Sequence, residues 1–218
     1  PDIVEAPNKE ARAALIQGLA HEDPTLLRRW QHAQRFSTSV GQFLKNCGWY
    51  PLCGGGDVNT SSVFAELGYR LIAATGRMGV VVPTSVLTDD TTKLFTQEVV
   101  QSARLSSVYD FDNSERLFPA VRPHQHFILM TVAGRSVLQD CDFAFFLTNP
   151  QQLDDSDTRV ALSAADIAML NRNTRTMPVF RSSAEAKVTK AIYRAHPLLK
   201  NDSKGESGDP WGLRFLTM

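Results

Sequence analysis

GRMGVVVPTSVLTDDTTKLF at residues 76–95 and LSSVYDFDNSERLFPAVRPHQHFILMTVAG at residues 105–134 decide the fold of this chain. Residues 78–83 are a continuous apolar run rich in valine, which predicts a strand covered on both faces. A helix is expected to begin at Asp89 or Asp90, followed by strands at 105–111 and 126–132. Strand, helix and strand in this order are typical of a parallel α/β sheet. The last strand follows a loop with two prolines instead of a long helix, so we expect it to run antiparallel at the sheet edge.

Buried strands need neighbouring strands, and little in the first 75 residues could supply them. The chain also opens on Pro1 and ends on an apolar pattern, WGLRFL at 211–216. We therefore expect the chain to be a piece of a larger enzyme.

The composition is that of a soluble globular protein. With 218 residues, 43% hydrophobic and 21% charged, the chain can form one large domain or two small ones. Lys plus Arg equals Asp plus Glu at 23 each, so any basic surface for nucleic acid has to be local. No stretch predicts a membrane span or a signal peptide, which favours a cytoplasmic protein without a membrane partner.

The cysteines do not predict a disulfide framework or a metal site. Cys47, Cys53 and Cys141 are an odd number without paired spacing, which suits a reducing compartment and buried or incidental thiols. Cys47 and Cys53 have no second pair to complete four zinc ligands. We expect no metal.

The first 45 residues predict a helical hairpin. Asn8 can cap one helix, and Asp23 followed by Pro24 can open the next. Trp30 and Phe36 are expected to pack in a core. Residues 46–60 form a glycine-rich loop, and the triple glycine leaves phosphate binding open, although no Gly-Lys-Ser/Thr follows it.

The next helix should start at Asp57, Asn59 or Thr60, and further elements follow the sheet. The inward face of that helix is predicted to consist of Val63, Phe64, Leu67 and Leu71. Beyond residue 134, a strand is expected at 143–147 and a polar loop at 151–157. Capping sequences open short helices at 163 and 182, and 200–210 has the composition of a flexible linker.

Several long motifs, in order along nearly the whole chain, resemble the adenine-N6 DNA methyltransferase half of large type IIG-like restriction-modification enzymes. They are GGGDVNT at 54–60 with VFAEL at 63–67, GRMGVVVPT at 76–84, TDDTTK at 88–93, YDFDN at 109–113 with LFPAV at 117–121, and LNRNTRT at 170–176 with VFRS at 179–182.

Two parts of that family's pattern do not occur in these 218 residues. One is the glycine-rich turn that binds S-adenosylmethionine, and the other is the Asn-Pro-Pro-aromatic loop that holds the adenine amino group. Asn149-Pro150 and Asp209-Pro210-Trp211 match the loop only in part and come too late in the chain. The resemblance therefore implies a fragment that begins downstream of the loop.

The resemblance implies an α/β fold, the distal half of a Rossmann-like S-adenosylmethionine-dependent methyltransferase sheet. A helical insertion is expected at 1–45, the α/β part at 46–147, and an α+β connector toward a target-recognition domain at 148–218. The implied function of the full-length enzyme is methyl transfer from S-adenosylmethionine to adenine N6 in double-stranded DNA. This fragment alone is expected to be inactive, with no catalytic residue of its own and no bound cofactor.

The resemblance also implies roles for six residues. Phe127 would stack on the flipped target base, although an ordinary core aromatic is an alternative. Arg122, His124 and His126 would contact DNA phosphates, or lie in a simple solvated loop. Asn59 and Phe64 would lie near the cofactor, while helix capping and core packing explain them as well.

Two other functions stay open. One is a non-catalytic scaffold whose sheet supports a DNA- or protein-binding surface, and the other is a free-standing phosphate-binding α/β enzyme. The sequence gives neither the DNA recognition site, nor the presence of a nuclease, nor the oligomeric state.

Overall fold

The computed structural model describes residues 2–135, 140–173, 176–196, 198–209 and 211–212, in two compact units, Pro1–Trp49 and Tyr50–Met218. Thr174 and Arg175 of the LNRNTRT motif and most of the apolar end, 213–216, lie outside these residues. The predicted three-part division of the chain stays a prediction.

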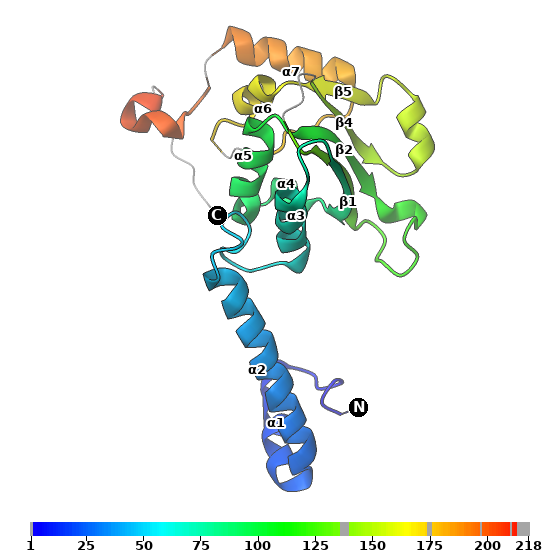
Figure 1. Ribbon diagram of the computed structural model, residues 1–218, viewed down its shortest axis with the longest axis vertical. Helices are drawn as coiled ribbons and strands as arrows, with labels where there is room; N and C mark the ends of the chain where they lie inside the picture. The colour runs from blue at the N-terminus through cyan, green and yellow to red at the C-terminus, as the bar shows by residue number, and fades with distance from the viewer. Residues whose placement is uncertain (1, 136–139, 174–175, 197, 210, 213–218) are drawn as a thin grey trace. The chain divides into compact units, whose positions relative to one another are not determined.

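The first unit is a helical hairpin, as predicted. Helix α1 spans Lys9–Glu22 and helix α2 spans Pro24–Asn46 (Figure 1). The side chain of Asn8 accepts the N–H of Ala11, and that of Asp23 accepts the N–H groups of Thr25 and Leu26. Both predicted caps are therefore confirmed.

The expected core packing of Trp30 and Phe36 is wrong. Trp30 is 38% exposed and Phe36 is 66% exposed, and α2 has no buried residue. A pair of helices can cover only one stripe of each partner, so most of a long helix remains open in such a unit.

The second unit contains a five-stranded mixed sheet. Its strands are β1 (Arg77–Pro83), β2 (Leu105–Asp112), β3 (His126–Ala133), β4 (Cys141–Leu147) and β5 (Arg159–Leu162), in the order β1-β3-β2-β4-β5. Strands β2 and β4 are parallel, whereas β3 is antiparallel to both β1 and β2. The four strands predicted from apolar runs are confirmed, and the chain has a mixed α/β fold.

The position of β3 differs from the prediction. It runs antiparallel, as expected, but it lies between β1 and β2 instead of at the edge. The crossover from β1 to β2 leaves the width of one strand between them, and β3 pairs with the backbone groups of both neighbours. Strand β1 thereby becomes an edge of the described sheet, and Val81 is 50% exposed. The expectation that this strand is covered on both faces was wrong.

Helices α3 (Thr60–Leu71), α4 (Ser85–Thr88) and α5 (Lys93–Gln101) lie together on one side of the sheet (Figure 1). The turn η1 (Asp90–Thr92) leads into α5, close to the predicted start at Asp89 or Asp90. The main core contains side chains of these helices and of the sheet, among them Phe95, Val108, Met130 and Phe143.

The buried face of α3 is rotated from the predicted one. Val63 is buried as expected, but Phe64 is 68% exposed and Leu71 is also exposed. The inward positions are Ser62, Val63, Ala65, Glu66 and Tyr69. Two of these polar side chains have specific partners, since Tyr69 bonds Glu98 and Ser102 while Glu66 accepts backbone N–H groups of the glycine-rich loop. These hydrogen bonds fix the rotation of α3 about its axis. The hydrophobic pattern of the sequence does not indicate them.

The rest of the second unit is built from short helices. The turn η2 (Asn113–Glu115) follows β2, η3 (Pro150–Asp154) lies in the predicted polar loop, and α6 (Ala164–Leu170) and α7 (Ser183–Ala195) start at the predicted caps Ser163 and Ser182. Residues predicted as a flexible linker contain a helical turn, η4 (Asp202–Gly208). The side chain of Asn173 holds this segment by bonding the carbonyl of Lys200 and the N–H of Asp202.

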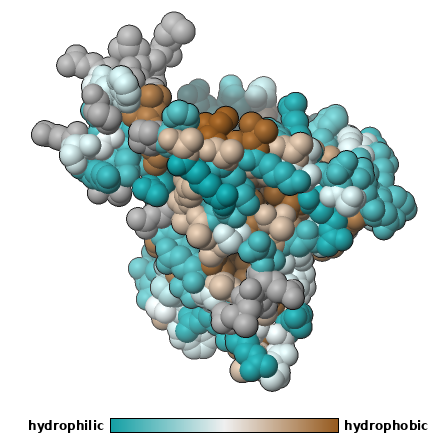
Figure 2. Space-filling view, turned by 90° about the horizontal axis from the view of Figure 1, so that it is seen from above, coloured by the Kyte–Doolittle hydropathy of each residue, from teal (hydrophilic) through white to brown (hydrophobic). Residues whose placement is uncertain are grey.

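Helix α7 is held in part by ion pairs, and its one buried residue is Ala186. Asp166 of α6 accepts hydrogen bonds from Lys190 at 2.9 Å and Arg194 at 3.0 Å. Val188 and Ile192 on α7 remain exposed. Figure 2, which views the molecule from above, shows apolar surface between polar side chains on that side.

Candidate functional site

Polar residues of two motifs meet the first residue of β3 where β1 and β2 end and β3 begins. The hydroxyl of Thr84, directly after β1, donates a 2.5 Å hydrogen bond to Oδ1 of Asp110 on β2. The other oxygen of Asp110 lies 3.3 Å from Nδ1 of His126, the first residue of β3. Asp110 is only 4% exposed, so this carboxylate is a buried connection between three strands.

A second carboxylate lies beside the first. Asp112 is opposite His126 in the β2–β3 register, and its Oδ2 atom is 3.3 Å from Nδ1 of His124. Burial raises the pKa of Asp112, but hydrogen bonds from His124 and from the N–H of Ser114 outweigh it and hold the pKa below its ordinary value of 3.8. Asp112 is therefore ionised at neutral pH.

Asn113 shapes the loop that carries Arg122 and His124. It is fully buried, and its amide donates to the carbonyls of Phe118, Val121 and Arg122 while its Oδ1 accepts the N–H of Phe118. These four bonds anchor the loop from inside. Arg122 and His124 are exposed at its surface, so the loop presents both side chains to solvent.

Phe127 is held between two other rings. It stacks on Phe111 at 5.4 Å between ring centroids and meets Phe118 edge-on at 4.9 Å. With 8% exposure it belongs to a small apolar cluster with Phe111, Ala144 and Leu147. Its packing in the core is established, and its stacking on a target base stays a prediction.

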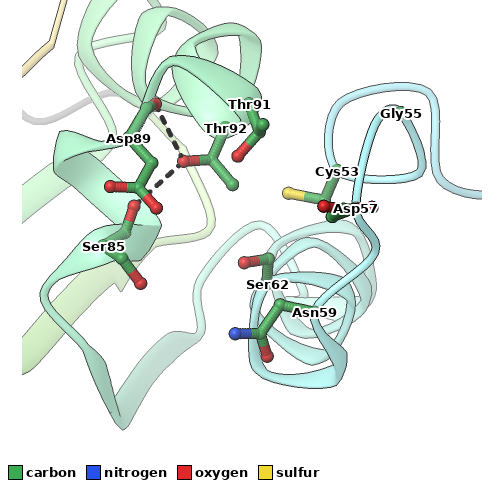
Figure 3. Close-up of a pocket in the computed structure, with 9 residues that line it drawn as sticks. All are labelled: Cys53, Gly55, Asp57, Asn59, Ser62, Ser85, Asp89, Thr91 and Thr92. Atoms are coloured by element: carbon green, nitrogen blue, oxygen red, sulfur yellow. Dashed lines mark hydrogen bonds between the residues drawn. The ribbon is translucent and has the colours of Figure 1, made fainter. Parts of the chain in front are cut away.

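A polar cavity of about 250 Å³ adjoins this end of β1 (Figure 3). One wall is the glycine-rich loop and the start of α3, and the other runs from α4 to η1. Its lining residues are Cys53, Gly55, Asp57, Asn59, Ser62, Ser85, Asp89, Thr91 and Thr92. Thr92 braces the second wall by donating to the carbonyls of Ser85 and Asp89 at 3.0 and 3.2 Å. Ser85 follows Thr84 directly, so the cavity and the Asp110 connection share one segment of chain.

A buried carboxylate holds the glycine-rich loop through hydrogen bonds to its backbone. Glu66 is completely buried and accepts the N–H groups of Leu52 and Cys53 at 3.2 and 2.8 Å. Burial first, and then the charge of Glu66, raise the pKa of the Cys53 thiol to about 12. Cys53 is therefore a neutral thiol in the cavity wall and not a nucleophile.

Asn59 and Phe64, the two predicted cofactor contacts, lie in different environments. Asn59 lines the cavity and also caps α3, because its Oδ1 accepts the N–H of Ser61 at 3.0 Å. Phe64 points away from the core and is not among the lining residues. The cap on α3 is confirmed, and contact of either residue with a cofactor remains a prediction.

Sequence reasoning gave no role to Thr84, Asp110 or Glu66. The signal for Asp110 was present, since a lone acidic residue in the apolar strand VYDF is rarely buried without a partner. Glu66 gave a weaker signal, because an acidic residue on a helix is usually exposed.

In the described residues, no group of three or more His, Cys, Asp or Glu is arranged to bind a metal ion. No helix there is both long and apolar enough to cross a bilayer.

Comparison with known proteins gives matches among solved structures alone. No family profile and no curated protein matches the sequence. The type IIG restriction endonuclease BpuSI is similar with a TM-score of 0.37 and 15% identity, over 44% of this chain and 11% of that protein. A type I restriction-modification system methyltransferase subunit from Streptococcus thermophilus is similar with a TM-score of 0.47 and 14% identity, over 65% of this chain and 34% of that subunit. The chain thus spans about a third or less of the length of each.

Proposed function

We propose that this chain forms one part of a site-specific DNA adenine-N6 methyltransferase of a restriction-modification system. The substrates would be S-adenosylmethionine and an adenine in double-stranded DNA. One observation carries the proposal. Two motifs that resemble this family, 76–84 and 109–113, are joined at one end of the sheet, because Thr84 of the first bonds Asp110 of the second and His126 of the next strand contacts the same carboxylate.

Methyl transfer to adenine requires that the methyl donor and the target base be positioned precisely at this end of the sheet. Adenine must leave the duplex to reach a methyl donor, and a flipped base is held by stacking and by hydrogen bonds to its edge. S-adenosylmethionine supplies the methyl group when it is bound. Transfer then depends on holding the donor and the amine in line, so rigid walls matter more than an acid or a base. Asp110, fixed by Thr84 and His126, supplies such rigidity here.

The cavity suits one portion of a polar ligand. Asp57, Asn59 and Asp89 offer acceptors for hydroxyl or amino groups, as found on the ribose and amino-acid parts of the cofactor. Its volume of about 250 Å³ lies below the roughly 300 to 1,000 Å³ of complete small-molecule sites. We propose that another segment of polypeptide, with the glycine-rich turn and the Asn-Pro-Pro-aromatic loop, completes the site.

Methyl transfer by the complete reading frame tests this proposal. The purified protein is incubated with duplex DNA and S-adenosylmethionine carrying a tritiated methyl group, and the nucleosides are separated to identify N6-methyladenine. We expect activity from the complete protein, a large loss in the Asp110→Asn variant, and none from the 218-residue chain alone. Lys187→Gln on the exposed face of α7 is the matched control and should retain activity.

Three outcomes would contradict the proposal: a reading frame without the two missing motifs, a methyl group on cytosine, or turnover by the isolated chain. The first would leave the site without a donor, and the second would change the reaction. The third would show that the cavity is complete as it stands.

A further inference from the structure

We propose that helix α2 binds the phosphate backbone of double-stranded DNA through a basic face, defined as Arg28, Arg29, His32 and Arg35. The identity of the partner rests on the proposed function, whereas the surface itself is independent of the site at the end of the sheet.

The charge of α2 is entirely of one sign. Its 23 residues include Arg28, Arg29, Arg35 and Lys45 but no aspartate or glutamate. The whole chain has a formal net charge of zero, so this helix is a local concentration of positive charge. Such a concentration attracts polyanions even when the net charge of the protein does not.

The basic residues form one face of the helix. Arg28, His32 and Arg35 are spaced by four and three residues, which brings them to the same side. All are exposed, and none of the four residues of the basic face has an ion-pair partner within the described part of the chain. The residues of α2 that line the groove toward α1 are Leu27, Trp30, Gln31 and Gln34, so α1 occupies a different side.

The amino end of α2 is already capped. The carboxylate of Asp23 accepts the N–H groups of Thr25 and Leu26, and the Arg28 guanidinium bonds the carbonyl of Pro24 and the hydroxyl of Thr25 at 3.4 and 3.5 Å. A phosphate would therefore meet the exposed side chains of the basic face and not the capped end of the helix.

The dimensions agree with one strand of a duplex. Arg28 and Arg35 are seven residues apart, about 10 Å along a helix axis, which matches about three steps of 3.4 Å along a DNA strand.

A membrane surface is the rival partner for a basic helix with exposed apolar residues. Phe36, Val40 and Phe43 of α2 are indeed exposed. The regular spacing of the arginines favours duplex DNA, and the vesicle measurement described below separates the two partners.

The test uses the full chain and a fluorescent duplex without a chosen recognition site. Anisotropy titrations at several salt concentrations give the slope of log affinity against log salt. We expect Arg28→Gln with Arg35→Gln to weaken binding and to reduce that slope by about 2, close to one unit per lost phosphate contact. Glutamine has a helix propensity close to that of arginine, and circular dichroism confirms that α2 persists.

Lys187→Gln with Lys204→Gln removes the same charge from exposed positions of the second unit and should leave the slope unchanged. Equal losses in both double variants, or no binding to duplex DNA at low salt, would overturn the inference. So would binding to phosphatidylserine vesicles but not to DNA. These results are separate from methyl transfer, because an active complete enzyme with unaltered DNA affinity in the α2 variant would refute this inference alone.

Discussion

The hydroxyl of Thr84 and the carboxylate of Asp110 form a 2.5 Å hydrogen bond that joins the ends of β1 and β2. Since β3 lies between these strands, the bond fastens two elements that have no backbone pairing with each other. A nearly buried carboxylate that loses a donor retains the cost of its desolvation.

Replacing Thr84 by valine should therefore lower the free energy of unfolding by about 1 to 3 kcal/mol. Thr84→Ser keeps the hydroxyl and should lose much less. Urea denaturation followed by circular dichroism measures both variants. Equal midpoints for Thr84→Val and the natural chain would show that the Asp110 connection contributes nothing to stability.

The attachment of α7 should weaken in acid. Burial opposes ionisation of Asp166, but hydrogen bonds from Lys190 and Ser163 prevail and lower its pKa below the ordinary value of 3.8. A lowered folded-state pKa stabilises the fold fully above the unfolded value, and this contribution is lost as pH falls through the folded value.

Asp166→Asn should consequently cost about 1 to 2 kcal/mol near pH 7, with allowance for the exposed Arg194, and the difference should disappear well below pH 3.8. Unfolding in urea between about pH 2.5 and about pH 7 gives the comparison. Asp154→Asn, on the exposed turn η3, serves as control. A difference that persisted at the acid end would refute the role of Asp166 ionisation.

The three thiols should react in a fixed order. Cys53 and Cys141 are buried, and burial first raises the pKa of both, to about 12 for Cys53. Cys47 is half-buried in the first unit. Alkylation with iodoacetamide at about pH 8, read by mass spectrometry, should label Cys47 first and the other two only after denaturation in urea. Early labelling of Cys53 in the folded protein would contradict the account of the Glu66 contact.

Phe127 and Phe64 should differ sharply in stability. Phe127→Ala removes a ring packed between Phe111 and Phe118 and should cost about 3 to 5 kcal/mol. Phe64→Ala changes a mostly exposed ring and should stay within about 0.5 kcal/mol. Thermal and urea unfolding measure both. Similar costs at the two positions would place Phe64 in a core after all.

Local signals in the sequence predicted elements well and their arrangement less well. The caps at Asn8, Asp23, Asn59 and Ser163 are confirmed, because capping depends on residues three apart. The insertion of β3 between β1 and β2 was not predicted, because apolar runs report burial but not the identity of the neighbour. Phe64 was misplaced for a related reason, since the face of α3 is set by the polar partners of Glu66 and Tyr69.

The candidate site was predicted only where motifs could be matched. Asn59 was singled out and does line the cavity, while Ser85, Asp89 and Thr92 come from a segment distant in the sequence. Their meeting depends on how α4 and η1 follow β1, which no periodicity reveals. Asp110 could have been found as a lone acid in a strand, but its bond to Thr84 is a property of the folded sheet.

The insertion of β3 also bears on how this protein is made. As the chain leaves the ribosome, β1 and β2 emerge in turn without a hydrogen-bonding partner in the described sheet until β3 arrives. Such long-range pairing is slow, and the waiting strands are exposed to association with other nascent chains. Slower translation just beyond Ala133, or a chaperone that shields the valines of β1, would favour recovery of soluble protein.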